Sequence, residues 1–343
     1  KTSKSGLKVE VVSADHQNKP DVGSNIARQW YDKDGVDAIF DVPTSSVALA
    51  VSQITREKGK AFINSGAGTA DLTGKACSPN TVHWTYDTWM LAHGTGSAIV
   101  KNGGDSWFFL TADYAFGHAL EKDTEEVVLK SGGKVLGKVR TPFPTQDFSS
   151  FLLQAQSSKA KIIGLANAGG DTINAIKQAA EFGIVKGGQN LAGLLVFITD
   201  IHGLGLNTAQ GLLLTETFYW GLPDQTRAWT KRYQAANKGK IPSSGVAGVY
   251  AGVLHYLKAV EAATTDDGTK VVATMQELPT DDPLFGKGSI RADGRKLHPA
   301  YLFEVKKPSE SKGPYDYYKV RSTIPAEQAF RPLNEGGCSL VKS

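Results

Sequence analysis

Apolar and polar positions alternate along the chain with two different periods. Short apolar runs predict β-strands over 36–42, 60–64, 106–111, 134–139 and 160–166. Amphipathic stretches between them predict α-helices over 20–35, 45–59, 114–133, 147–159 and 171–184. Strands that alternate with helices of this length indicate βαβ units and a mostly parallel sheet that helices cover on both faces.

This series of strands and helices runs twice. Further strands are expected at 7–13 and 191–198, with a final pair at 301–307 and 315–321. A turn-rich, aromatic segment, CSPNTVHWTYDTWMLAHG, separates the two series, and two more helices are expected after about residue 220. The order predicts two α/β lobes with several chain crossings between them.

Two loops at predicted strand ends carry the first candidate site. The loop at 64–69 is rich in glycine, so its N–H groups can approach an anion closely. The preceding strand ends in Thr44, Ser45 and Ser46, where Ser45 is the expected N-cap of the next helix. Either loop alone fits an ordinary strand-to-helix turn. Together they offer more donors than capping needs, and the lack of Lys or Arg favours a carboxylate over a phosphate.

The second series of strands ends in aromatic and small polar residues. Tyr114 and Phe116 follow the strand at 106–111, and Trp89 lies near the crossover. The segment from Asn167 to Asp171 follows the strand at 160–166, and Asp200 follows the one at 191–198. Each aromatic residue alone is more often part of a core. As a set at strand ends, they predict a flat apolar wall with a few polar groups.

Composition and charge narrow the class of protein. The 343 residues are 41% hydrophobic and 21% charged, which is enough for two domains with their own cores. The net charge is +4 without a block of like charges, so a nucleic-acid partner is not expected. The apolar runs are far too short to span a bilayer, so no direct membrane insertion is expected.

Enzyme and metal signatures are absent from the sequence. It has no G-x-S-x-G, H-E-x-x-H or G-x-x-x-x-G-K-[ST] motif, and the G-x-G at 203–205 lacks the third glycine of a dinucleotide fingerprint. No catalysis, cofactor or metal is therefore expected, although a doubly wound enzyme is a third alternative. Cys77 and Cys338 would pair in an exported protein and stay reduced in the cytosol, and the residues alone leave that choice open.

Several separate blocks resemble one known family. SGAGTADLTG, FFLTADYAFGHALEKD and KIIGLANAGGDTINAIKQAAEFGI are similar to type I periplasmic binding proteins of branched-chain amino acid ABC transporters. The leucine/isoleucine/valine-binding protein is the best-known member. DFSSFLLQAQSSKAKIIGLANAGGD especially resembles a proteobacterial subgroup associated with aromatic carboxylates. The blocks occur in order and with matching spacing over essentially the whole chain.

The resemblance implies an architecture and a setting. It implies two doubly wound parallel-sheet lobes joined by a three-stranded hinge, with lobes at 1–86 plus 222–296 and at 87–221 plus 297–343. It implies a periplasmic monomer that delivers a small-molecule carboxylate to an ABC transporter permease. Family members begin with one more βα unit of about 40 residues, so that unit and a signal peptide are expected to be missing from this sequence.

The resemblance also assigns roles to residues. Ser45 matches the serine that holds the ligand carboxylate, and Gly66 and Gly68, on either side of Ala67, match positions whose backbone completes that grip. Thr69 would supply the hydroxyl one place later than in the family. Phe116 matches a pocket aromatic, and the loop 167–171 faces the ligand.

Asp200 lies near the acidic residue that pairs with the ammonium group of an amino acid, but the local sequence lacks the expected glutamate. An aromatic acid is therefore favoured as ligand. A branched-chain or other amino acid is the alternative within the same class. A ligand-sensing domain of a receptor or regulator is the alternative outside it.

Overall fold

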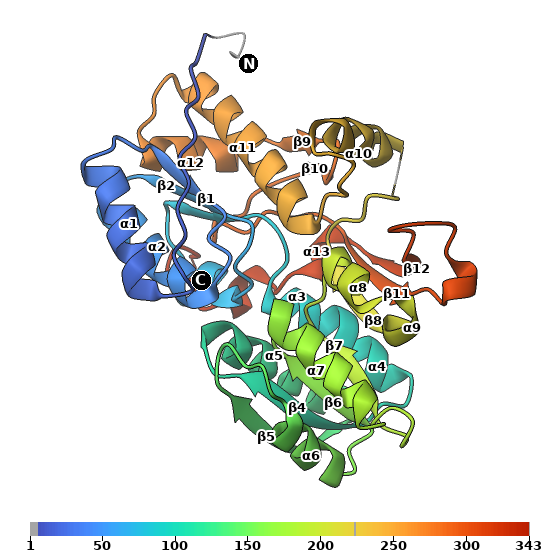
Figure 1. Ribbon diagram of the computed structural model, residues 1–343. Helices are drawn as coiled ribbons and strands as arrows, with labels where there is room; N and C mark the ends of the chain where they lie inside the picture. The colour runs from blue at the N-terminus through green and yellow to red at the C-terminus, as the bar shows by residue number, and fades with distance from the viewer. Residues whose placement is uncertain (1–5, 223, 343) are drawn as a thin grey trace.

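The computed structural model describes residues 6–222 and 224–342 and contains two α/β bodies beside a smaller antiparallel sheet (Figure 1). Residues 1–5, 223 and 343, which the predicted lobes include, lie outside the described residues. Among the helices of the described part, none combines the length and apolarity that a membrane crossing requires.

The first body is built on three parallel strands in the order β1–β2–β3. They are β1 (Ala38–Phe40), β2 (Ala61–Asn64) and β3 (Thr81–His83). Helices α1 (Pro20–Asp32) and α2 (Ser45–Glu57) cover one face, where Phe62 packs against Val47 and Val51. Helices α11 (Ser244–Ala263) and α12 (Gly268–Glu277) cover the other face, where Ile63 lies. Successive residues of β2 thus point to opposite cores, as a sheet buried on both faces requires.

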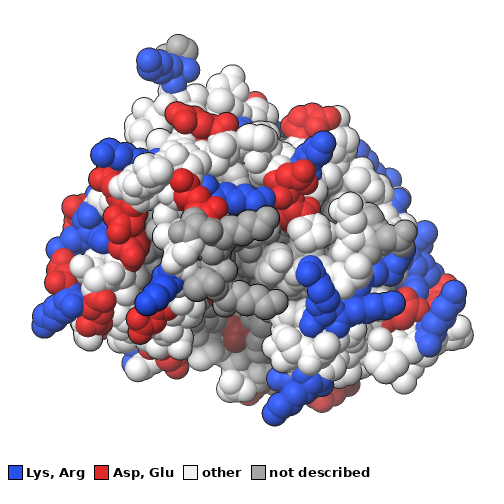
Figure 2. All heavy atoms as spheres, turned by 90° about the horizontal axis from the view of Figure 1, so that it is seen from above, with Lys and Arg blue, Asp and Glu red and all other residues white. Residues whose placement is uncertain are grey.

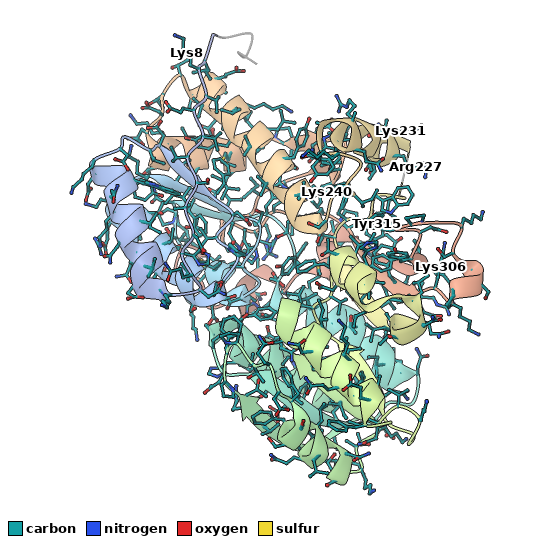
Figure 3. All side chains as sticks on the ribbon, in the orientation of Figure 1. Lys8, Arg227, Lys231, Lys240, Lys306 and Tyr315 are labelled. Carbon is teal, nitrogen blue, oxygen red and sulfur yellow. A yellow bond between two sulfur atoms is a disulfide. The ribbon has the colours of Figure 1, made fainter. Side chains whose placement is uncertain are left out.

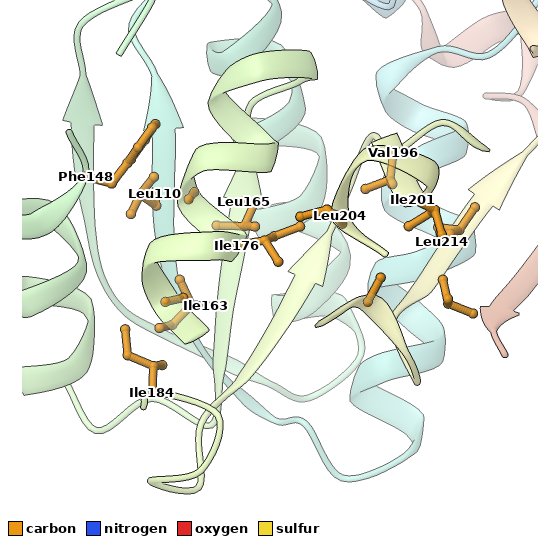
Figure 4. Close-up of a cluster of buried hydrophobic side chains, with 14 of the residues drawn as sticks. Leu110, Phe148, Ile163, Leu165, Ile176, Ile184, Val196, Ile201, Leu204 and Leu214 are labelled. Carbon is orange, nitrogen blue, oxygen red and sulfur yellow. The ribbon is translucent and has the colours of Figure 1, made fainter. Parts of the chain in front are cut away.

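The second body is a four-stranded parallel sheet in the order β5–β4–β6–β7. Its strands are β4 (Ser106–Ala112), β5 (Lys134–Thr141), β6 (Ile162–Ala166) and β7 (Asn190–Gly193). The helices around it are α5 (Ala115–Lys130), α6 (Ser149–Ser157), α7 (Gly169–Glu181) and α8 (Ile198–Leu204). Figure 4 shows one of its cores, in which Leu110 and Leu165 of the sheet lie among side chains of α7 and α8.

A third, antiparallel sheet in the order β12–β11–β8 lies beside the second body. Its strands are β8 (Leu213–Glu216), β11 (Ala300–Val305) and β12 (Tyr318–Ile324). The remaining elements include the hairpin β9 (Thr280–Asp282) and β10 (Gly286–Gly288) and the helices α3 (Thr88–Leu91), α4 (Ser97–Lys101), α9 (Leu206–Ala209), α10 (Asp224–Ala236) and α13 (Ala326–Ala329). Tyr315, labelled in Figure 3, lies in the β11–β12 loop, and its carbonyl accepts hydrogen bonds from Tyr219 and Trp220.

The chain passes between the two bodies three times: after β3, after β8 and before β11. Residues of α10 and α12 share a core with β2 and β3, whereas β8 and β11 share cores with the second body. The crossings let residues far apart in sequence meet between the bodies.

Three local predictions from the sequence were wrong. Residues 7–13 form no strand, because no described strand pairs with them and β1 pairs only with β2. The predicted strand 191–198 ends at Gly193, and α8 begins at Ile198, since a continuous apolar run does not distinguish a buried strand from the start of a buried helix. The N-cap of α2 is Thr44, and Ser45 is the first helical residue.

Cys77 and Cys338 form a disulfide with an S–S distance of 2.03 Å, which decides the pairing that the sequence left open. The bond attaches the end of the chain to the first body, and Figure 1 shows the C-terminus beside that body. Arg331 adds a hydrogen bond from its guanidinium to the carbonyl of Ala70, 2.8 Å away. The tail that follows β12 therefore contacts the first body as well as the second.

Charged side chains of both signs are mixed on the surface. In Figure 2, Lys and Arg lie among Asp and Glu over the face that is seen. This distribution agrees with the net charge of +4 and the absence of long runs of like charge in the sequence.

Candidate functional site

The β1–α2 loop leaves the sheet in an unusual backbone conformation. Asp41 and Val42 both have positive φ, 72° and 62°. Such angles are uncommon for any residue other than glycine and are a genuine outlier for a β-branched valine. Strain of this kind persists where the surrounding structure enforces it, and it is concentrated at binding sites. The strained turn places Ser45 at the start of α2.

The N-terminus of α2 is buried but carries no side-chain cap. Thr44, the N-cap, directs its hydroxyl to the Asn18 side chain instead of to the helix. Ser45 is 1% exposed. The first N–H groups of any helix have no partner within the helix, and a buried helix end normally satisfies them with a cap, water or a ligand. The N–H groups of Ser45 and Ser46 are therefore available to an anion.

The loop after β2 is tied to this helix start. The Thr69 N–H donates to Ser45 Oγ at 3.1 Å, which leaves the hydroxyl proton of Ser45 free to donate. Asn64 closes the loop, since its side chain accepts from the Ala67 N–H and donates to the Ala67 carbonyl. Among the described residues, no hydrogen bond uses the N–H of Gly66 or Gly68. The structure thus brings Ser45, Gly66, Ala67, Gly68 and Thr69 together.

Both glycines are required by close packing. A Cβ on Gly66 would lie 2.8 Å from Pro43 Cα in the neighbouring loop. A Cβ on Gly68 would lie 2.7 Å from the ring of Phe116 and 3.0 Å from that of Tyr86. The loop is therefore pressed against the β1–α2 loop on one side and against the second body on the other.

Aromatic rings of the second body face this loop. Phe116 is 2% exposed in the first turn of α5, and Tyr114 precedes it as an N-cap without a side-chain cap bond. Tyr114 stacks on Phe143 with ring centroids 4.1 Å apart. Tyr86 packs edge-on to Phe197 at 5.6 Å and donates its hydroxyl to the Gly66 carbonyl.

Two buried polar groups of the second body lack partners. Asn167 accepts from the Thr172 hydroxyl, but its Nδ2 makes no hydrogen bond in the described structure. Asp171 accepts from the Thr145 N–H at 3.1 Å, while its Oδ2 is also unpaired. Buried polar groups are nearly always satisfied, so groups of this kind at strand ends are candidates for binding a ligand.

Burial raises the pKa of the acidic side chains around these residues. It raises the pKa of Asp200 to about 6, although this carboxylate accepts from the Phe197 N–H at the start of its own helix. Burial also raises the pKa of Asp41, which accepts a hydrogen bond from Ser65. Glu216 has its pKa raised to about 8, again by burial. In each case burial favours the neutral form of the carboxyl group.

Other predicted residues have different surroundings. Trp89 stacks on His93 with centroids 3.5 Å apart, one helical turn further along. Ser46 is half-buried next to Ser45 in the first turn of α2. Among the described residues, no group of three or more His, Cys, Asp or Glu is arranged to hold a metal ion.

Sequence reasoning missed several residues that line the same region. Tyr86 lies in the turn-rich, aromatic segment that separates the two series, and Phe197 lies in the strand predicted at 191–198. Nothing in the local sequence marks Phe143 or Glu216. Their positions depend on contacts between segments distant in sequence. The strained pair Asp41 and Val42 had no signal in the sequence, because a residue that precedes a proline, as Val42 precedes Pro43, is biased toward negative φ.

Comparisons with known proteins identify the class. A family model described as periplasmic binding protein matches residues 3–314. A solved periplasmic binding protein from Burkholderia mallei is 57% identical with a TM-score of 0.96, over 98% of this chain and 89% of that one. Leu/Ile/Val-binding protein homolog 6 of Brucella melitensis is 25% identical over 314 residues, which cover 87% of this chain and 78% of that protein.

A further solved structure shares the fold at lower identity. It is a solute-binding protein of an ABC transporter from R. palustris in complex with benzoate. It has a TM-score of 0.84 at 21% identity, over 98% of this chain and 90% of that one.

The chain belongs to the periplasmic binding protein family, and it has the α/β fold of the type I members. These are the extracytoplasmic solute-binding proteins of ABC transporters, and the family hands small molecules to transporter permeases.

Proposed function

We propose that the protein binds a small carboxylate, an aromatic acid, between its two lobes and delivers it unchanged to the permease of an ABC importer. The observation that carries this proposal is the buried, uncapped N-terminus of α2 beside the unpaired N–H groups of Gly66 and Gly68. The Ser45 hydroxyl completes a set of donors without a metal or a basic side chain. Such a set fits the two oxygens of one carboxylate.

The remainder of the ligand would lie against the aromatic wall of the second body. Phe116 and Tyr114 of the second body, together with Tyr86 at the boundary of the first lobe, present ring faces and edges, and aromatic pairs favour offset or edge-to-face contact with a ligand ring. Structural neighbours from Rhodopseudomonas palustris strains are complexes with benzoate, 4-hydroxybenzoate and 3,4-dihydroxybenzoic acid, which supports this choice of ligand.

Binding on this proposal requires both lobes. Residues 1–86 and 222–296 form the lobe with the carboxylate cradle, and 87–221 and 297–343 form the lobe with the aromatic wall. The ligand contacts donors and rings from both lobes only when they are close together, so it stabilises the closed arrangement. The binding protein acts as a monomer in the periplasm on this proposal.

An amino-acid ligand is the second candidate. Leu/Ile/Val-binding proteins are among the relatives, and Asp200 is the acid that would pair with an ammonium group. Against this, Asp200 already accepts a hydrogen bond from Phe197 at the start of its own helix, and the local sequence lacks the glutamate expected for an amino-acid ligand. A sensor domain of a receptor would bind the same ligand and differ only in its partner.

Isothermal titration of a Ser45→Ala variant tests the carboxylate cradle. Loss of the hydroxyl donor should lower the affinity for aromatic acids by about tenfold or more, since a hydrogen bond to a charged group contributes about 1.5–3 kcal/mol. Ser149→Ala is the matched control, because Ser149 also begins a helix, α6, but lies on the far side of the second body. Equal affinities for wild type and Ser45→Ala would refute the cradle.

A further inference from the structure

Glu216 is a buried acid that the carboxylate cradle does not use. It is the last residue of β8, is 3% exposed, and pairs across the sheet with Tyr301. Its Oε1 accepts a hydrogen bond from the Tyr318 hydroxyl at 3.1 Å. No salt bridge of the described residues involves it. One tyrosine hydroxyl is a sparse environment for a carboxyl group that can take part in several hydrogen bonds.

Two unpaired hydroxyls accompany this carboxyl. Ser244, at the start of α11 in the first body, is close enough to lower the pKa of Glu216, but its Oγ meets the geometry of no hydrogen bond in the described structure. Thr217 follows Glu216 directly, and its Oγ1 is buried and unpaired as well. Three buried polar side chains with spare hydrogen-bonding capacity thus lie at the crossing between the bodies.

Contacts connect this cluster to the predicted ligand site. Tyr86 donates to the Gly66 carbonyl in the cradle, and its ring packs on Phe197. Phe197 in turn donates its N–H to Asp200 at 2.9 Å. Charges on Glu216 and Asp200 both help to raise the pKa of Tyr86. Gly248, one turn after Ser244 in α11, packs against the residue that precedes Gly66, since a Cβ on Gly248 would lie 3.1 Å from Ser65 Cβ. The cluster therefore lies close to the cradle loop.

A structural role alone does not account for Glu216. The same face of β8 carries Leu214, which is fully buried in the core of the second body. An apolar residue at 216 would avoid the cost of burying a carboxyl with few partners. Because burial raises the pKa of Glu216 to about 8, the group is protonated at neutral pH and can both donate and accept without repelling an anionic ligand.

We propose that Glu216 is a specificity-determining residue that hydrogen-bonds a hydroxyl on the ligand ring, meta or para to the carboxylate. The protein then selects hydroxylated aromatic acids over the unsubstituted acid. This inference rests on the proposed function, and it adds the substrate class. A ligand without the hydroxyl leaves the spare hydrogen-bonding capacity of this buried cluster unused, so it binds less tightly than a hydroxylated acid.

Titration calorimetry with benzoate, 3-hydroxybenzoate and 4-hydroxybenzoate tests the proposal. Wild type should prefer the better hydroxybenzoate over benzoate by about tenfold or more. Glu216→Leu should reduce that preference to within about twofold while benzoate affinity stays unchanged, because only the hydroxyl loses its partner. Glu216→Gln should retain the preference, since a neutral amide also donates and accepts.

Controls separate this inference from general damage. Glu304→Gln on the neighbouring strand β11 removes an acid that pairs with Arg321 and should leave all affinities unchanged. Thermal unfolding checks that each variant is folded, and Glu216→Met replaces Glu216→Leu if the branched side chain prevents folding.

The outcomes distinguish two failures. If wild type binds benzoate and both hydroxybenzoates with equal affinity, or if Asp200→Asn abolishes the preference and Glu216→Leu does not, the role of Glu216 is refuted while the aromatic-acid function stands. If none of the three acids binds wild type, the proposed function fails, and the inference that rests on it fails too.

Discussion

Arg295 contacts two other chain segments near the crossings between the bodies, one at Thr85 and Asp87 and one at Phe330. Its guanidinium is fully buried, lies 3.2 Å from the Asp87 carboxylate, donates to the Thr85 carbonyl and rests over the ring of Phe330, 4.2 Å from the centroid. Burial lowers the pKa of Arg295 to about 10, but the side chain is still charged at neutral pH. Asp87 also caps α3 through the Met90 N–H.

Arg295→Met should destabilise the protein by about 3–5 kcal/mol, because it leaves the Asp87 carboxylate buried without its cation. Urea unfolding measures this loss. Arg56→Met on the exposed side of α2 is the control and should change the unfolding free energy by less than about 0.5 kcal/mol. A similar small effect for Arg295→Met would show that the buried pair contributes little.

Glu216 should make stability depend on pH. Burial raises its pKa from 4.5 to about 8. Between pH 4.5 and pH 8 the native state therefore keeps a proton on Glu216, whereas the unfolded state releases it. Stability from this group is therefore complete below pH 4.5 and is lost as pH rises toward 8, at up to about 1.4 kcal/mol per pH unit.

Melting curves of wild type and Glu216→Gln between pH 5 and 9 measure this dependence. The melting temperature of the variant should increase relative to that of wild type as pH rises through that window, because glutamine does not titrate. A difference between the two melting temperatures that stays constant with pH would contradict a raised pKa at this position.

The strands and helices that carry the site were largely predictable from the sequence, but the contacts between residues distant in sequence were not. Parallel strands with intervening helices place successive strand ends side by side, so the adjacency of Ser45 and the loop 64–69 followed from the periodicity. Tyr86 and Glu216 were missed because contacts such as that of Glu216 with Tyr318 join residues 102 positions apart. The strand expected at 7–13 failed for the same reason, since periodicity specifies faces but no pairing partner.

The contact between the 64–69 loop and α5 provides a prediction at the scale of elements. In Gly68→Ala the new Cβ would press on Phe116, which is 2% exposed and has little room to move. The two bodies should therefore approach less closely, and the affinity for an aromatic acid should fall by about tenfold.

Calorimetric titration measures this effect, with thermal unfolding of the ligand-free variant as a check on folding. Gly203→Ala in α8 is the control, because its added Cβ meets nothing within 4 Å. Unchanged affinity in Gly68→Ala would mean that the loop and α5 separate when ligand binds.

At the scale of the whole molecule, one disulfide bond joins the C-terminal tail to the first body. The Cys77–Cys338 disulfide spans 261 positions and fastens the tail after β12 to the first body. A closed loop of this length restricts the unfolded chain strongly in the chain-entropy model. The double variant Cys77→Ser with Cys338→Ser should lose about 2–5 kcal/mol of unfolding free energy.

Unfolding of this double variant and of reduced wild type should give the same lowered stability. Ligand affinity should stay near that of wild type, since neither cysteine lies in the predicted site. A variant as stable as wild type would show that the tail is held by its other contacts, such as Arg331 with Ala70.

The central claim is that the two bodies hold an aromatic carboxylate between them. Isothermal titration of ligand-stripped protein with 4-hydroxybenzoate, and in parallel with leucine, tests it most directly. The proposed site predicts saturable one-to-one binding of 4-hydroxybenzoate, recovered unchanged afterwards, and no binding of leucine. Saturable binding of leucine without any heat from the aromatic acid would contradict the proposal and establish the amino-acid alternative.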